Sequence, residues 1–158
     1  MTSADSPRTA LDTSVLVAGI CSWHVRHADA QPFLAACLVA DDPLIVPLPA
    51  LIEAWAVLTR MPAPHRLSPQ DAHALLDGTL RQRSAVVALE GSEGWSMLDD
   101  ALRAGVAGGS SYDLHIAACA RKGGATRLAT FNERHFERFD LPGLEIVIPG
   151  AQGRAGGL

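Results

Sequence analysis

The sequence has little aromatic character and no long apolar run. Only 5% of its 158 residues are Phe, Trp or Tyr. No stretch reaches the roughly 20 apolar residues that cross a bilayer, and Met1 to Thr9 has no apolar core of signal-peptide length. We therefore expect a soluble, cytoplasmic protein with no membrane contact.

Cysteine is scarce and is not arranged for cross-linking. The three cysteines are an odd number, lie far apart and form no C-x-x-C motif. Cys37 and Cys119 fall within apolar helical patterns. This usage argues against a disulfide framework and predicts reduced, mostly buried thiols.

A basic surplus is also missing. The formal net charge is −4, whereas proteins that bind nucleic acid usually present a basic surface. A bound divalent cation, or basic residues gathered on one face, would reconcile an acidic total with a phosphate ligand. The candidate phosphate contacts are Arg60, Arg66, Arg121, Lys122, Arg127 and Arg134.

Two common site motifs are absent. The histidines show no H-E-x-x-H spacing, and the Gly-rich stretch 105–111 lacks the Lys of a phosphate-binding loop. Neither a zinc peptidase site nor a nucleotide-binding loop is indicated.

What is present is a regular alternation of strand and helix patterns, with enough apolar residues for one globular domain. Strands are predicted over 9–17, 44–46, 85–89, 126–130 and 145–148. Helices are predicted over 29–40, 49–60, 69–82, 92–104 and 111–122, with one helical turn over 132–136. Asp29 and Ser68 are the expected N-caps of the first and third of these helices. This order predicts an α/β fold with a mainly parallel sheet of about five strands.

Polar residues follow two of these strands. Asp12, Thr13 and Ser14 mark the end of the first strand, and Asn132 comes just after the fourth. In parallel sheets, ligands bind at the carboxyl ends of the strands, near the point where the strand order reverses. We expect the loops that carry Asp12 and Asn132 to meet at such a point.

Three carboxylates stand out by position, and each has a simple structural explanation. Asp12 can cap a turn with Thr13 or Ser14. Glu53 can complement the positive end of its helix, where we place it in about the first turn. Asp113 can be the third-residue acid of a capping box that Ser110 begins.

The three acids together indicate a cation. A parallel sheet brings strand ends and helix starts to one rim, where clustered carboxylates repel each other unless a cation lies among them. Mg²⁺ fits oxygen ligands of this kind, with Mn²⁺ as a possible substitute. The chemistry that such a site suits is metal-assisted attack of water on a phosphodiester.

The arrangement resembles the PIN domain, the nuclease fold of VapC-type toxins. Four stretches carry the resemblance: Leu11–Leu16, Pro49–Glu53, Ser111–Ala118 and Leu128–Phe136. It covers residues 8–148 as one domain and leaves a flexible tail over 149–158. It implies a three-layer α/β/α sandwich and Mg²⁺-dependent cleavage of single-stranded sites in RNA, such as tRNA or another structured RNA. It also implies a homodimer and a cognate antitoxin as an inhibiting partner.

By the resemblance, Asp12, Glu53 and Asp113 are the metal-binding acids. Thr13, Ser14 and Thr130 are their supporting hydroxyls, and Asn132 completes the catalytic group. Many PIN domains have Asp where this chain has Asn132, and often a second Asp in place of His135. This departure favours one tightly held Mg²⁺, with a second arriving together with RNA.

Two alternatives stay open at this point. One is a catalytically inactive module with the same fold that binds RNA or protein, which the uncharged Asn132 and the acidic total favour. The other is a phosphatase that uses Asp12 as its nucleophile. The phosphatase pattern wants a second Asp two residues later, where this chain has Ser14.

Overall fold

The computed structural model describes residues 7–151, which form one five-stranded sheet flanked by helices. All strand pairs are parallel, in the order β3-β2-β1-β4-β5. The strands are β1 (Thr9–Leu11), β2 (Leu44–Pro47), β3 (Ser84–Val87), β4 (Arg127–Ala129) and β5 (Glu145–Val147). The helices are α1 (Thr13–Ile20), α2 (His27–Leu38), α3 (Leu48–Arg60), α4 (Pro69–Leu80), α5 (Gly91–Ala104), α6 (Ser110–Lys122) and α7 (Glu133–Phe136).

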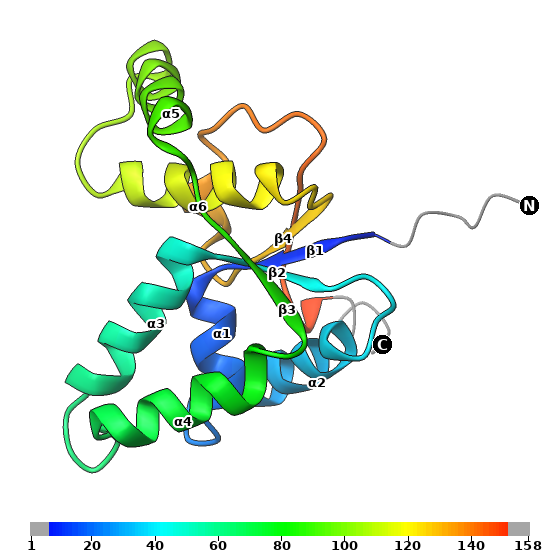
Figure 1. Ribbon diagram of the computed structural model, residues 1–158, viewed down its shortest axis with the longest axis vertical. Helices are drawn as coiled ribbons and strands as arrows, with labels where there is room; N and C mark the ends of the chain where they lie inside the picture. The colour runs from blue at the N-terminus through cyan, green and yellow to red at the C-terminus, as the bar shows by residue number, and fades with distance from the viewer. Residues whose placement is uncertain (1–6, 152–158) are drawn as a thin grey trace, which may run out of the picture.

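The helices cover both faces of the sheet. Helices α1 to α4 lie on one side, and α5 and α6 lie on the other (Figure 1). Helix α7 packs against α6. The central strands β1 and β2 are buried along their whole length, as expected of parallel strands covered on both faces. The prediction of an α/β/α sandwich with five parallel strands is confirmed.

The predicted strand over 9–17 is wrong in its second half. Strand β1 ends at Leu11, and α1 begins at Thr13 with Asp12 as its N-cap. Helix α1 is buried over Thr13 and 15–19. A helix buried on nearly every side has no polar stripe, so its apolar run cannot be told from a buried strand by periodicity.

The expected helix caps were partly right. Ser68 caps α4, since its hydroxyl accepts a hydrogen bond from the Asp71 amide at 3.0 Å. Asp29 does not cap α2, because that helix begins at His27. Asp29 instead lies in the first turn and accepts a hydrogen bond from Arg26 Nε at 3.0 Å.

Other expectations concern cysteines, membrane contact and the tail. All three cysteines are buried free thiols, as predicted. No helix among residues 7–151 is both long and apolar enough to cross a membrane. The predicted flexible tail over 149–158 lies, beyond residue 151, outside the described residues.

The strand order places a reversal point beside β1. The chain passes from β1 outward to β2 and β3, and then returns to the other side of β1 for β4. Leu11 at the end of β1 is paired with Ala129 at the end of β4. The segments that carry Asp12 and Asn132 therefore leave the sheet side by side, as the sequence predicted.

Candidate active site

Asp12 is held by donors from two segments of the chain. Its side chain is only 4% exposed. Oδ1 accepts a hydrogen bond from the Thr13 amide at 2.8 Å, and Oδ2 accepts from Ser14 Oγ at 2.8 Å and Thr130 Oγ1 at 2.7 Å. Asp12 is thus the helix cap that the structural explanation required. That role leaves open a further one, because a carboxylate has room for about four hydrogen bonds or ligands.

The two hydroxyls that support Asp12 also hold the segment after β4. Ser14 Oγ accepts from the Phe131 amide at 3.0 Å, and Thr130 Oγ1 accepts from the Asn132 amide at 2.9 Å. The start of α1 and the segment after β4 are therefore bound together, which fixes Asp12 and the backbone of Asn132 relative to each other.

Glu53 lies in the second turn of α3, one turn later than predicted. It is the sixth residue of that helix, whose first turn has no acid. Interaction with the helix N-terminus falls off within the first turn, so it does not account for Glu53. Thr13 Oγ1 donates a hydrogen bond to Glu53 Oε2 at 2.8 Å, which joins the second acid to the residue beside Asp12.

Asp113 comes from the opposite side of the sheet, in the first turn of α6. The predicted capping box with Ser110 is wrong, because Gly109 is the N-cap and makes no side-chain cap bond. Ser110 Oγ instead accepts from Arg138 Nη1 at 2.7 Å. The nearest charged partner of Asp113 is His135, whose Nδ1 lies 3.3 Å from Asp113 Oδ2.

The pKa of Asp113 shows that the acids sense one another. Burial is the largest effect and raises the pKa of this carboxyl, and the negative charges of Asp12 and Glu53 raise it further. His135 and Arg138 oppose the shift. The positive groups nearby do not fully offset the repulsion between the three carboxylates, which is the condition that favours a bound cation.

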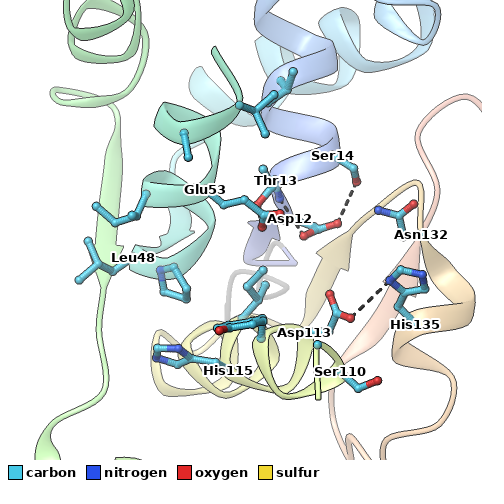
Figure 2. Close-up of a pocket in the computed structure, with 18 of the residues that line it drawn as sticks. Asp12, Thr13, Ser14, Leu48, Glu53, Ser110, Asp113, His115, Asn132 and His135 are labelled. Carbon is cyan, nitrogen blue, oxygen red and sulfur yellow. Dashed lines mark hydrogen bonds and ion pairs between the residues drawn. The ribbon is translucent and has the colours of Figure 1, made fainter. Parts of the chain in front are cut away.

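The predicted site residues share one pocket of about 990 Å³. It is lined by Asp12, Thr13, Ser14, Glu53, Asp113 and Asn132, and Figure 2 shows these side chains around a common space. Thr130 is not a lining residue and lies beneath Asp12. Of the six proposed phosphate contacts, only Arg60 lines this pocket.

Sequence reasoning missed several lining residues. Tyr112, His115 and Arg138 line the pocket, and the contact between His135 and Asp113 was not foreseen. His115 follows Asp113 by two residues and was expected on a different face of its helix, yet both border the pocket (Figure 2). The pocket spans enough of α6 to include both positions. No signal in the sequence pairs His135 with Asp113.

The donor set suits a hard divalent cation. Within residues 7–151, no three His, Cys, Asp or Glu side chains are grouped closely enough to hold a metal ion by themselves. Mg²⁺ does not require such a cage, because it usually keeps several waters and takes one or two carboxylates together with substrate phosphate. In the described part of the chain, none of Asp12, Glu53 and Asp113 forms an ion pair with Arg or Lys. The residues present therefore fit Mg²⁺ or Mn²⁺.

Comparison with known proteins identifies the family. The PIN domain family model matches residues 9–141. The chain is 33% identical to Ribonuclease VapC40 of Mycobacterium tuberculosis over 139 residues, which cover 87% of this chain and 96% of the relative. The chain belongs to the PIN domain family, and its resemblance to VapC-type proteins is confirmed.

Solved structures show the same fold. The crystal structure of VapC20 of M. tuberculosis, a Sarcin-Ricin loop cleaving toxin, has a TM-score of 0.64 and 20% identity. That match covers 82% of this chain and 93% of VapC20. VapBC2 of Rickettsia felis, bound to a DNA fragment from its promoter, has a TM-score of 0.59 and 18% identity, with 89% and 97% covered.

Proposed function

We propose that this protein is a Mg²⁺-dependent endoribonuclease toxin that hydrolyses phosphodiester bonds in RNA and is neutralised by a cognate antitoxin. The observation that carries the proposal is the meeting of Asp12, Glu53 and Asp113 in one pocket at the reversal point of the sheet. The ribonuclease name of a relative at 33% identity supports the reaction class.

In this proposal, Asp12, Glu53 and Asp113 hold the metal, for which Mn²⁺ is a possible substitute. A divalent cation there would polarise the phosphodiester and offset the charge that develops on its oxygens. Thr130 and Ser14 orient Asp12, and Thr13 orients Glu53, so that two of the three carboxylates are positioned before any ligand arrives.

Asn132 offers an amide oxygen but no charge at the outer side of the pocket. We propose that it contacts the substrate or a second, weakly held metal that arrives with RNA. His135 sits beside Asp113 and is a ring that substrate or metal must displace or accept as a neighbour.

The proposed substrate is a structured RNA, such as tRNA, cut at an exposed single-stranded site. The acidic net charge of −4 supports recognition by shape and a few local cations over a broad basic surface. VapC20 is described as a toxin that cleaves the Sarcin-Ricin loop, so tRNA and ribosomal RNA are the two substrates to compare.

The proposed partners are an antitoxin and a second copy of the chain. Leu48, Ile52 and Tyr112 are exposed apolar or aromatic residues that line the pocket, and they support docking of a protein segment there. Helix α5 exposes Leu98 and Leu102, which supports a further contact surface.

The test is cleavage of total RNA by the purified protein with Mg²⁺ or Mn²⁺, compared with EDTA and with Asp12→Asn. We expect metal-dependent cutting that falls at least about 100-fold in the variant, the scale on which loss of one charge-stabilising group slows an enzyme. Asn is itself a good helix cap, so Asp12→Asn should fold. Cutting at the wild-type rate by this variant would sink the assignment.

The alternative is a catalytically inactive module that binds RNA or protein. The uncharged Asn132 favours it. A folded protein that binds neither Mg²⁺ nor Mn²⁺ in calorimetric titration, and cuts no RNA, would establish this alternative.

A further inference from the structure

Two loops meet through aromatic rings close to the pocket. Trp23 lies between α1 and α2, and His65 lies between α3 and α4. Their rings are stacked, with centroids 4.3 Å apart and planes inclined by 21°. His24 is tilted against Trp23 at 5.9 Å. We call these three rings the aromatic cluster.

The cluster borders the pocket that holds the acids. His24 and Arg60 both line that pocket, together with Asp12 and Glu53. Arg60 follows Glu53 by two turns of α3, which places it about 10 Å further along the helix axis. The cluster therefore lies beside the proposed reaction centre and outside it.

One ring of the cluster keeps an accessible surface. Trp23 remains 37% exposed although one of its faces is stacked on His65. In a sequence with only 5% aromatic residues, the tryptophan is held in place by a ring from another loop. Nucleic-acid bases stack on aromatic and His rings held in this manner.

The polar groups around the cluster suit a nucleotide. Arg60 is exposed and has no carboxylate partner within residues 7–151. Burial, and then the charges of Arg26 and His27, lower the pKa of His24, so this ring is neutral at pH 7. His24 Nδ1 accepts a hydrogen bond from the Arg26 amide at 3.1 Å, which leaves the proton on Nε2, a donor for a base edge.

We propose that the aromatic cluster and Arg60 form a nucleotide subsite that binds one unpaired base of the RNA beside the bond that is cut. The base stacks on the exposed part of Trp23, and His65 supports that ring from behind. Arg60 contacts the phosphate of the same nucleotide. This inference rests on the proposed ribonuclease function and adds to it the residues that select a single-stranded site.

The experiment uses Asp12→Asn protein, so that the RNA stays intact, and fluorescein-labelled octauridylate as the probe. Anisotropy gives the affinity, and quenching of tryptophan fluorescence reports a base on Trp23. Adding Trp23→Leu should weaken binding about 10-fold, within the range for loss of one stacked base, and should remove most of the quenching.

The matched control is Trp95→Leu. Trp95 is 72% exposed on α5 and does not line the pocket, so its loss should leave both the affinity and the quenching unchanged. Trp23→Phe keeps a ring on His65 and should keep most of the affinity. Equal binding by the Trp23→Leu and Trp95→Leu proteins would overturn the proposal and leave the stack as a tie between loops.

Arg60 is tested by the salt dependence of binding. Arg60→Gln should lower the slope of log K against log[salt] by about 1, as expected for one lost phosphate contact. Arg103→Gln, on α5 and away from the pocket, should not change it. An unchanged slope in Arg60→Gln contradicts the phosphate contact.

A probe with single abasic positions tests the subsite without any change at Trp23. One position should weaken binding about 10-fold when its base is removed, and the others should matter less. Uniform effects at all positions would overturn the proposal even if the Trp23→Leu protein fails to fold.

The proposed function and the subsite fail in different ways. Absence of metal-dependent cutting by the wild-type protein, with the Trp23-dependent binding intact, removes the function and leaves the subsite. Cutting that is lost in Asp12→Asn, with binding indifferent to Trp23, removes only the subsite.

Discussion

The two deepest carboxylates of the pocket are held in opposite ways. Asp12 receives three hydrogen bonds, from the Thr13 amide and the hydroxyls of Ser14 and Thr130. Asp113 receives none from an amide or hydroxyl of the described residues, and its one close partner is His135. Asp12 is positioned by the fold itself, whereas Asp113 carries a charge that the fold only partly compensates.

The difference teaches where each half of the site gets its order. Donors on α1 and after β4 fix Asp12 without any ligand. Burial and the charges of Asp12 and Glu53 raise the pKa of Asp113, so its charged form costs stability until a cation arrives. Active sites commonly retain such unfavourable charge because function requires it.

The largest expected effect comes from removing the acceptor at Asp12. Asp12→Ala leaves a helix amide and two hydroxyls without their acceptor, and we expect a loss of about 2–4 kcal/mol in the free energy of unfolding. Asp12→Asn keeps an acceptor for the cap and should lose clearly less. Urea unfolding of both proteins measures this, and equal losses would show that the cap bonds are unimportant.

The second effect comes from Thr130, which is completely buried beneath Asp12. Thr130→Val removes the donor to Asp12 and the acceptor for the Asn132 amide. We expect roughly 10-fold weaker Mn²⁺ binding by calorimetry, since residues that orient metal ligands affect affinity on this scale. Thr126→Val is the control, because Thr126 is exposed and its hydroxyl makes only a 3.4 Å contact with the Arg8 carbonyl. Similar affinity in both variants would contradict the positioning role.

The third effect has the opposite sign. Asp113→Asn should stabilise the metal-free protein at pH 7 by about 0.5–1 kcal/mol, because it removes a charge that burial and like charges disfavour. It should also abolish cleavage. Thermal melts in EDTA measure the gain, and Asp99→Asn, an exposed acid on α5, serves as the control.

The gain from Asp113→Asn should depend on pH. The folded pKa of Asp113 lies above the ordinary aspartate value of 3.8, so between the two values the folded state binds more protons than the unfolded chain. Wild-type stability from this group is therefore lost as the pH rises through that window. The advantage of the Asn variant should vanish in strong acid and grow as the pH rises. An advantage that is constant with pH contradicts this origin.

The smallest effect is expected at Asn132. Asn132→Asp adds a charge on an exposed loop and should change stability by less than about 0.5 kcal/mol. It should strengthen a second Mn²⁺ site, because the number of charged ligands tunes metal affinity. Calorimetry of both proteins checks the stoichiometry, and no change in the second site would show that Asn132 does not face a metal.

Much of the fold was predictable because its elements carry clear local signals. Ser68 followed by Pro69 marks a helix start, and α4 begins there. Gly105 ends α5 in the left-handed conformation, with φ of 66°, as its position suggested. The error over 9–17 arose because α1 is buried on nearly all sides, so tertiary burial replaced the amphipathic pattern.

The site was predictable only in outline. That the segments with Asp12 and Asn132 leave the sheet together follows from parallel topology, and the strand order confirms it. The contact between Asp113 and His135 depends on how α7 packs against α6, which no local pattern encodes. The stack of Trp23 on His65 likewise joins two loops whose meeting is a tertiary event. The assignment of metal-binding residues stays a prediction.

The hydrogen bond between Thr130 and Asp12 joins residues 118 positions apart in the chain. During synthesis, a chain that has emerged only as far as α6 already contains Asp12, Glu53 and Asp113. It still lacks the β4 strand that pairs with β1 and the hydroxyl that orients Asp12. Completion of the pocket is therefore a late event on the ribosome, and a prematurely terminated chain is a harmless one.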